Sequence, residues 1–355
     1  MPTNVRNSGE KINLDQLLLK QVPLAQYSSI HTGGVADLAA YPSDFEELRE
    51  LLHYARENKL PITVLGGGTN SLISDEGIEG LTIITSHLKR RHVQGEMFCV
   101  RCGLGLDRAI DLAIEDGLTG LELLGGLPGT VGGAIHGNSS AHGTSISDLL
   151  YYVDYMTFDG KLHRKQIHLD EFSYRRSPFT DRHDIILYEA GFRLYPTTQT
   201  SEARKKKDEV KHRRKTNGQY DNPSIGSIFV NPEGYKAGAL IEQCNLKGYS
   251  IGGAQISHRH ANMIINSNAK ATSSDIKELI EHVRQEVQQQ FQITLVEEIQ
   301  YLGRWGSGRE CAADSDGKAS GIPQPLEPTP DDRRVLLRST QQRMSRFPVA
   351  HASLC

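Results

Sequence analysis

Apolar residues recur at helix and strand periods along the chain, and this pattern predicts an α+β fold. A helix is expected over residues 43–60, where Ser43 and Glu46 have the spacing of a capping box ahead of an apolar stripe: Phe45, Leu48, Leu51, Leu52 and Ala55. A second helix is expected over 106–116, with Gly117 as its C-cap. Short apolar runs predict strands at 62–65, 81–85, 97–102 and 184–194.

Two strand-like runs, 151–158 and 161–168, flank Asp159-Gly160 and predict a hairpin. Both turn residues tolerate positive φ, so we expect a type I′ turn. In the second half, a helix near 236–244 and strands within 250–265 precede a last helix. Thr272 and Asp275 should cap that helix, whose apolar face is Ile276, Leu279, Ile280, Val283 and Val287. A strand over 294–302 should close the fold.

A dense basic helix over 202–216 separates the two halves, and we interpret it as a domain junction with a solvated surface. Residues after Trp305 are rich in Gly, Ser, Pro, Asp and Arg, which predicts a disordered tail. The sequence therefore divides into a lead, a first domain of two α/β subdomains, a smaller second domain and the tail, at 1–25, 26–197, 203–304 and 305–355.

Composition narrows the class of protein. Lys and Arg number 40 against 43 Asp and Glu, and this near-neutral balance disfavours a nucleic-acid binder. Because no apolar run approaches the roughly 18–20 residues that span a bilayer and the N-terminus is polar, we expect a cytoplasmic protein outside the membrane.

The sequence has five cysteines, an odd and sparse set that is typical of reduced thiols. Cys99 and Cys102 form a C-x-x-C in a strand, which places their thiols on opposite faces. No obligate protein partner is evident.

Two glycine-dense loops are candidates for a phosphate site. The first, Gly66, Gly67, Gly68, Thr69, Asn70 and Ser71, follows a strand, and successive amides there can form a nest for an anion. It matches neither a Rossmann fingerprint nor a P-loop. The second comprises Gly125, Gly126, Pro128, Gly129, Thr130, Gly132, Gly133 and Ala134, and leads to Asn138. The first alone could be a tight turn, whereas the glycine density of the second is unusual for a plain loop; together they favour one large ligand with a diphosphate, a dinucleotide.

Several polar residues are candidates for chemistry, each with a plainer alternative. Arg175 or Arg176 could hold a carboxylate, or be surface arginines. Ser227 follows Gly226 on a turn into a strand and could face a pocket or be a plain turn residue, and Ile225 disfavours a hydrolase elbow. Alternation puts Glu297 and Glu298 on opposite faces of a strand, so one should face inward. His258 and His260 are weak metal candidates, because no further ligand lies nearby in the sequence.

Taken together, the motifs over about residues 20–303 resemble the bacterial UDP-N-acetylenolpyruvoylglucosamine reductases. The motifs are His31-Thr-Gly-Gly-Val-Ala36, Leu65-Gly-Gly-Gly-Thr-Asn70, the run from Gly120 to Ala134, Tyr174-Arg-Arg-Ser177, Gly226-Ser-Ile-Phe229 with Asn231-Pro232, Leu246-Lys-Gly-Tyr249 and Leu295-Val-Glu-Glu-Ile299. Only 51 residues separate Arg175 from Ser227, as in the family's shorter type without an extra tyrosine-bearing loop. Gly137-Asn-Ser-Ser140 departs from the usual Asn-Ala-Gly but keeps Asn138.

The resemblance implies a vanillyl-alcohol-oxidase-like FAD-binding domain followed by a small α/β substrate-binding domain. It implies non-covalent FAD on the two glycine loops, NADPH as hydride donor, and the enolpyruvyl ether of UDP-N-acetylglucosamine as substrate, in peptidoglycan synthesis and hence in cell-wall biogenesis, cell shape, the cell cycle and division. The family's catalytic residues fall on Arg175, Ser227 and Glu298, and its substrate contacts on Tyr174, Asn231 and Lys247. A flavin oxidase of the same fold and a nucleotide-binding module are the alternatives.

Overall fold

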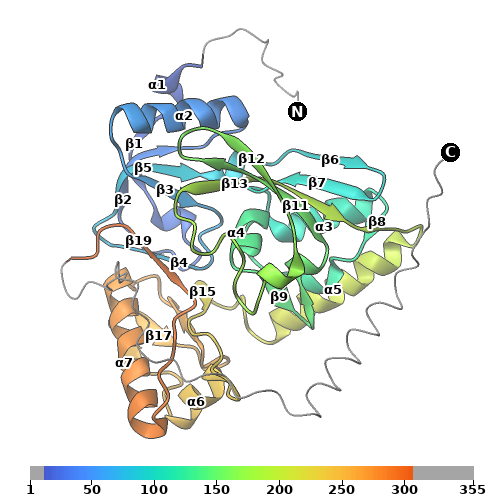
Figure 1. The fold of residues 1–355 in the computed structure, drawn as a ribbon. Helices are drawn as coiled ribbons and strands as arrows, with labels where there is room; N and C mark the ends of the chain where they lie inside the picture. The colour runs from blue at the N-terminus through green and yellow to red at the C-terminus, as the bar shows by residue number, and fades with distance from the viewer. Residues whose placement is uncertain (1–11, 307–355) are drawn as a thin grey trace, which may run out of the picture. The chain divides into compact units, whose positions relative to one another are not determined.

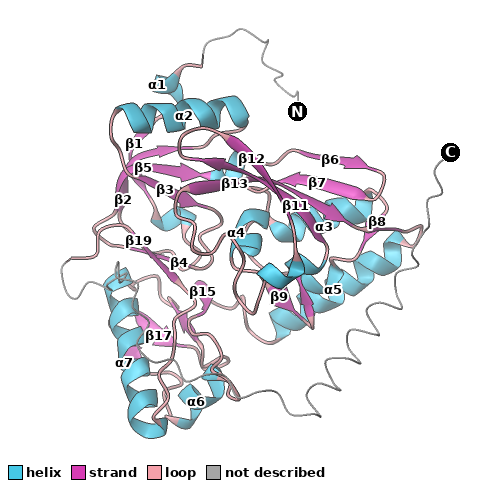
Figure 2. Ribbon diagram, viewed as in Figure 1, coloured by secondary structure: helices cyan, strands magenta, loops and turns pink. Residues whose placement is uncertain are grey.

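The protein is described by a computed structural model, which covers residues 12–306. The tail predicted beyond Gly306 and the first eleven residues of the lead lie outside the described residues. The described part contains both helices and strands, with several strands following one another directly, in agreement with the α+β prediction (Figure 1, Figure 2). Within this part, no helix is both long and apolar enough to cross a bilayer.

The first sheet has the order β1-β2-β5-β3, from strands Leu19–Pro23, Val35–Ala40, Ile78–Ile84 and Ile62–Leu65. β1 is antiparallel to β2 and the other pairs are parallel, so residues 19–23 of the predicted lead form an edge strand of this sheet.

Helix α2, Phe45–Glu57, buries Leu48, Leu51, Leu52 and Ala55 as predicted. Its N-cap, however, is Asp44, whose carboxylate accepts from the Glu47 amide, because the helix begins one residue later than a Ser43 cap requires. The short helix α1 spans Leu14–Leu17.

The second sheet has the order β12-β11-β13-β7-β6, from strands Leu162–Gln166, Leu150–Thr157, Ile185–Arg193, Met97–Arg101 and Arg91–Gln94. Helices α3, Leu106–Glu115, and α4, Val131–His136, pack against one face in a shared apolar core.

The predicted hairpin is β11–β12, but the turn is not type I′: Gly160 has φ of +84° while Asp159 stays out of the positive-φ region. The Gly160 amide donates to the Thr157 carbonyl, which closes a turn with a single left-handed residue. Two short strand pairs join this part: β8 with β14 (Leu118–Thr119, Tyr195–Pro196) and β9 with β10 (Ser140–Ala141, Thr144–Ser145).

The third part is a small sheet, β15-β18-β17-β16, backed by two helices. The strands are Ser224–Ser227, Met263–Ile265, Ala254–Ile256 and Ser250–Ile251, and the helices are α6, Ala237–Gln243, and α7, Ser273–Phe291. The Thr272–Asp275 capping box and the predicted apolar face of α7 are confirmed. The predicted closing strand is much shorter than 294–302: β19 is Gln300–Leu302, and it pairs in parallel with β4, Ser71–Ile73. The end of the third part thus returns to the first glycine loop.

The basic helix α5, Thr200–Thr216, is more than a solvated junction. The Lys207 side chain is 2% exposed, with its ammonium 2.6 Å from the Asp111 carboxylate and 3.1 Å from that of Asp107. Lys211 adds a 2.7 Å contact to Asp107. Both aspartates lie on α3, so these ion pairs hold α5 against α3. The two helices are far apart in the chain, and the local sequence pattern therefore cannot show this pairing.

Replacing Lys207 with Met should destabilise the protein by about 3 kcal/mol, because two partly buried carboxylates lose the buried ammonium that contacts both of them and keep only partly exposed cations as partners. Urea unfolding at a fixed FAD concentration measures this. Lys206→Met on the exposed side of the same helix is the matched control and should change the free energy of unfolding by less than about 0.5 kcal/mol. Equal effects of the two substitutions would contradict this role of the ion pairs.

Candidate active site

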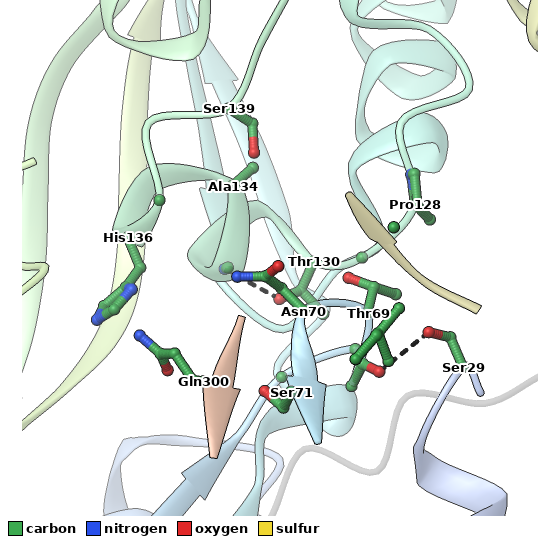
Figure 3. A pocket seen from close by; sticks show the side chains of 18 of the residues that line it. Ser29, Thr69, Asn70, Ser71, Pro128, Thr130, Ala134, His136, Ser139 and Gln300 are labelled. Atoms are coloured by element: carbon green, nitrogen blue, oxygen red, sulfur yellow. Dashed lines mark hydrogen bonds between the residues drawn. The ribbon is translucent and has the colours of Figure 1, made fainter. Parts of the chain in front are cut away.

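A cavity of about 860 Å³ lies where the three parts meet, a size suited to a large ligand. Its wall includes residues of both glycine loops, of the 173–177 segment, of β15 and of the segment that leads into β19. Figure 3 shows Thr69, Asn70 and Ser71 of the first loop near Thr130 and Ala134 of the second, with Gln300 of β19 beside them.

The two glycine loops approach each other backbone to backbone. A Cβ on Gly67 would lie 2.8 Å from the Gly129 Cα, and a Cβ on Gly129 would lie 2.6 Å from the Thr69 hydroxyl. Gly68 has φ of +60°, and a Cβ there would lie 1.9 Å from the Tyr27 carbonyl oxygen. Glycine is therefore a steric requirement of the loop contact at positions 67 and 129, and of the contact with Tyr27 at position 68.

The chemistry of this cavity fits a diphosphate. Gly67, Gly68 and Thr69 line it, and their amides donate to no group within residues 12–306. In the second loop, Thr130 caps α4, its hydroxyl accepting from the Gly133 amide at 3.2 Å. Unpaired amides at the wall of a cavity are suited to an anion, so these residues fit the diphosphate of a dinucleotide.

Most of the predicted cofactor residues line the cavity: Gly66, Gly67, Gly68, Thr69, Asn70, Ser71, Pro128, Gly129, Thr130, Gly132, Gly133 and Ala134. Gly125, Gly126 and Asn138 do not. Gly125 and Gly126 lie against α5, where a Cβ on Gly125 would be 2.7 Å from Lys207 and one on Gly126 3.0 Å from Lys211. The Gly126 amide donates to Asp107 at 2.8 Å, so these two glycines let α5 pack against the loop.

The first glycine loop also holds the other parts of the site. The Asn70 side-chain amide donates to the Glu298 carbonyl at 3.0 Å, and the Gln300 amide donates to the Asn70 carbonyl at 2.9 Å. The Ser29 hydroxyl lies 3.1 Å from the Gly68 carbonyl oxygen and 2.6 Å from that of Ser224, at the start of β15. Ser29 and Asn70 therefore connect the loop to the two segments that carry Ser227 and Glu298.

The structure brings Arg175, Ser227 and Glu298 to the wall of the same cavity, from three distant segments. The Arg175 Nε and Glu298 Oε1 lie 3.1 Å apart, an ion-pair distance without hydrogen-bond geometry. Burial raises the pKa of the Glu298 carboxyl, and the attraction of Arg175 only partly offsets this. Glu297 points the other way and pairs with Arg284 on α7, which agrees with the predicted alternation.

The chain is similar to known proteins over both of its domains. Residues 36–165 match the FAD binding domain model, and residues 218–302 match the model of the UDP-N-acetylenolpyruvoylglucosamine reductase C-terminal domain. The reductase of Pediococcus pentosaceus is 35% identical over 286 residues, which cover 81% of this chain and 94% of that protein. The chain belongs to the UDP-N-acetylenolpyruvoylglucosamine reductase family.

Further relatives agree. The UDP-N-acetylenolpyruvoylglucosamine reductase of Nostoc punctiforme is 39% identical over 295 residues, 82% of this chain and 88% of that protein. The crystal structure of the reductase from Thermus caldophilus matches with a TM-score of 0.66 and 30% identity, over 80% of this chain and 98% of that one. The predicted two-part fold, an FAD-binding domain followed by the reductase's C-terminal domain, is thus confirmed.

The turn that carries Arg175 in this reductase family member is strained and firmly anchored. Arg175 has φ of +60°, within a tight turn closed by reciprocal hydrogen bonds between Ser173 and Arg176. The Asn138 side-chain amide donates to the Ser173 carbonyl at 2.9 Å. The hydroxyls of Ser177 and Thr180 both donate to the His136 carbonyl at 2.8 Å. The C-terminal end of α4 therefore fixes the arginine turn, and the Asn138 side chain serves that turn.

The three predicted substrate residues do not line the cavity. Tyr174 is exposed, and its hydroxyl accepts from the Asn231 side-chain amide at 3.1 Å. The Asn231 side-chain oxygen Oδ1 accepts from the Ala237 amide at 3.0 Å, at the start of α6. The Lys247 ammonium pairs with Glu242 at 2.6 Å. The Asn231–Tyr174 bond nevertheless links the third part to the residue next to Arg175.

Other residues of the cavity wall were not singled out for the site by sequence reasoning: Ser29, His136, Arg214, Tyr220 and Gln300, with His260 considered only as a weak metal candidate. Arg214 donates to the Gly125 carbonyl and Tyr220 to the Gly126 carbonyl, and burial lowers the pKa of Arg214. Burial also lowers the pKa of His260, whose Nδ1 has no partner within residues 12–306. Isolated polar residues between motifs carry no local signal, so only the family match could have indicated them.

The Asn138 anchor predicts a matched pair of stability changes. Asn138 has φ of +42°, so Asn138→Ala loses the bond to Ser173, about 1 kcal/mol, and adds about 1 kcal/mol of backbone strain. Asn138→Gly loses the bond without the strain. Urea unfolding should therefore find the alanine variant the less stable of the two; equal losses would mean that the backbone conformation is not strained.

Proposed function

We propose that this chain reduces the enolpyruvyl ether of UDP-N-acetylglucosamine to UDP-N-acetylmuramate, as an FAD-dependent oxidoreductase of peptidoglycan precursor synthesis. The carrying observation is that one cavity contains both the glycine-loop amides that suit a diphosphate and the Arg175, Ser227 and Glu298 side chains. When bound, FAD accepts a hydride from NADPH and delivers a hydride to the substrate.

The residues that would hold FAD are Gly67, Gly68 and Thr69, whose amides have no partner within residues 12–306, and the second loop from Pro128 to Thr130; all of these residues line the cavity. We propose the first domain, 26–197, as the part that binds FAD and the second, 203–304, as the part that binds substrate. The matched ranges 36–165 and 218–302 fall within these bounds and support the division.

Arg175 and Glu298 would act on the substrate carboxylate. As a hydride reaches the vinyl CH₂ carbon, negative charge develops as an enolate on the carboxylate side. A guanidinium fixed by an anchored turn can hold that charge without reorganising. Glu298, with its raised pKa, can approach the carboxylate in the protonated form and donate a hydrogen bond to it.

Ser227 would donate the proton that completes the reduction, at the carbon that bears the ether oxygen. Its backbone position supports this role: Gly226 has φ of +80°, which turns the chain so that Ser227 lines the cavity at the end of β15. Because a serine is a weak acid, the Arg175 guanidinium and the Glu298 carboxyl group on the same wall would have to polarise its hydroxyl.

For the nucleotide of the substrate we propose Tyr174, Asn231 and Lys247 as contacts, on the strength of the family motifs and the Tyr174–Asn231 bond. Lys247 would exchange its exposed Glu242 partner for a phosphate. From a role in peptidoglycan precursor synthesis we also propose a cytoplasmic location and a link to cell shape, the cell cycle and division.

Ser227→Ala should slow only the substrate half of the cycle. Loss of a positioned general acid costs about 10²–10⁴-fold, or roughly 3–5 kcal/mol of barrier, whereas NADPH oxidation needs no proton at a substrate carbon. Anaerobic stopped-flow absorbance should show normal bleaching by NADPH and slow recovery with substrate. An equal loss in both phases would make Ser227 structural.

The pH profile should identify Glu298. Its pKa is raised by burial, so the protonated form persists to higher pH than in an ordinary carboxyl group and is lost as pH rises through this raised value. The rate of substrate-dependent recovery should fall over the same rise, while bleaching by NADPH should not. In Glu298→Gln the step in the pH profile should vanish, and a step that persists would assign it to another group.

FAD should be bound without a covalent link. The family resemblance supplies no residue that would anchor the flavin covalently. His31, which lines the cavity, is the nearest candidate for an attachment site. Acid precipitation of the purified protein should therefore release the yellow colour into the supernatant. Colour that stays in the pellet of the wild type but not in that of His31→Ala would establish a covalent bond.

A further inference from the structure

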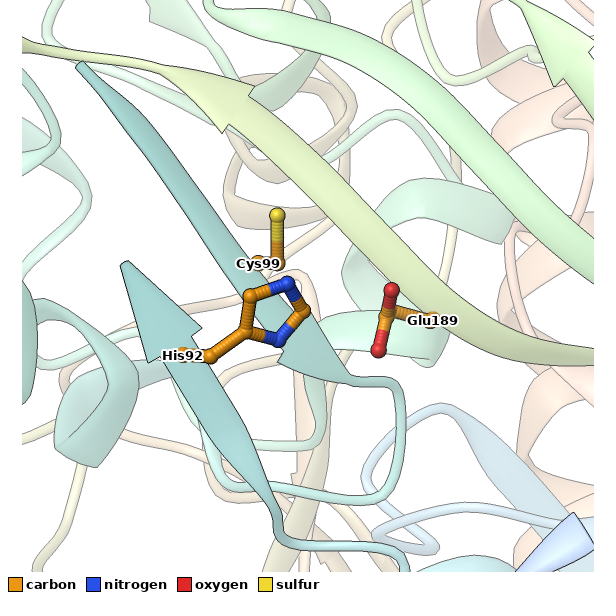
Figure 4. Close-up of side chains that lie close together, drawn as sticks. All are labelled: His92, Cys99 and Glu189. Atoms are coloured by element: carbon orange, nitrogen blue, oxygen red, sulfur yellow. The ribbon is translucent and has the colours of Figure 1, made fainter. Parts of the chain in front are cut away.

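Three side chains with metal-ligating atoms lie together on the second sheet, and none of them lines the active-site cavity. They are His92 of β6, Cys99 of β7 and Glu189 of β13, whose ligating atoms all lie within 4.8 Å of one another. Figure 4 shows the three side chains directed toward one another from adjacent strands, the His92 ring between the Cys99 sulfur and the Glu189 carboxylate.

The register of the sheet produces this cluster. His92 is directly opposite Cys99, and Cys99 is opposite Gly191, so Glu189 lies two residues further along β13 on the same face. Gly191 has no side chain to separate the ligands, and the Tyr152 ring occupies that space: a Cβ on Gly191 would lie 2.2 Å from it. Backbone pairing on three adjacent strands thus fixes the spacing of all three ligands.

The cluster is buried on one side and open on the other. Cys99 and Glu189 are 4% and 8% exposed, while His92 is exposed and leaves a route for an ion and for water. The Tyr152 hydroxyl lies 3.0 Å from one Glu189 oxygen and 3.3 Å from the Cys99 sulfur, and Arg101 Nε lies 3.4 Å from the other Glu189 oxygen. Such outer contacts orient ligands at metal sites. The positive charge of the neighbouring Arg164 is paired with the Asp154 carboxylate through two hydrogen bonds.

We propose that His92, Cys99 and Glu189 bind one Zn²⁺ ion, with water as the remaining ligand on the exposed side. One sulfur, one nitrogen and one oxygen donor suit zinc, whereas Mg²⁺ and Ca²⁺ take oxygen ligands. Binding replaces the Cys99 thiol proton, which passes to solvent as the Zn–S bond forms. The ion would tie the edge strand β6 to β13 across β7 and so stabilise the FAD-binding domain against unfolding.

The test uses the full-length holoenzyme freed of metal by a chelator and dialysed against Zn²⁺. We expect one bound ion per chain by elemental analysis, and a melting temperature that rises with Zn²⁺ concentration. In separate samples loaded with ¹¹³Cd²⁺, the NMR shift should show a single thiolate ligand. His92→Ala changes an exposed side chain, so it should fold with normal flavin content while losing at least about tenfold in Zn²⁺ affinity. Cys99→Ser and Glu189→Gln should lose as much.

Cys244→Ser is the matched control, because Cys244 is a free, partly exposed thiol in the third part of the fold and should leave binding unchanged. The proposal is overturned if the wild type binds no Zn²⁺, or if His92→Ala and Cys99→Ser keep the wild-type stoichiometry and melting shift. Loss of binding in Cys244→Ser instead would place the ion elsewhere and overturn it as well. Since none of these readouts depends on turnover, they are independent of the proposed reaction.

Discussion

The rest of the site depends on the contact between two backbones, Gly67 against Gly129. At this separation neither Gly67 nor Gly129 has room for a side chain, and the amides of Gly67, Gly68 and Thr69, which line the cavity, donate to no group within residues 12–306. Through Asn70 and Ser29, the first loop also fixes the carbonyls of Glu298 and Ser224. The surface that suits the cofactor diphosphate and the segments that carry Ser227 and Glu298 are therefore parts of one hydrogen-bonded unit.

Arg175 is held by a second, independent set of contacts. Its turn is anchored to the end of α4 by Asn138, Ser177 and Thr180, and its positive φ is tolerated because these bonds determine the conformation on both sides of it. The pKa of Glu298, the partner of Arg175, also depends on its position in the fold. Burial of Glu298 outweighs the attraction of a guanidinium 3.1 Å away, because the two groups meet without a hydrogen bond. The outcome is a carboxyl group with a raised pKa beside a permanent cation.

Local physics explains which parts could be predicted from the sequence. The glycine loops, the Thr272 cap, the α7 stripe and the opposite directions of Glu297 and Glu298 depend on backbone sterics or on short periods, which nearby residues record. The burial of Lys207 by α3, the pairing of β19 with β4 and the use of Asn138 to anchor residue 173 depend on segments far apart in the chain. The roles proposed for Arg175, Ser227 and Glu298 rest on the family motifs, since an arginine, a serine and a glutamate in isolation carry no comparable signal.

The central claim is that one cavity joins a flavin to a substrate carboxylate site. The most direct measurement is the visible absorbance of the purified holoenzyme under anaerobic conditions, with NADPH and then the enolpyruvyl ether of UDP-N-acetylglucosamine added in turn. The account predicts a yellow protein that NADPH bleaches and that one equivalent of the enolpyruvyl ether restores in the absence of oxygen. A bleached protein whose colour returns only when oxygen is admitted, with the enolpyruvyl ether unconsumed, would contradict it.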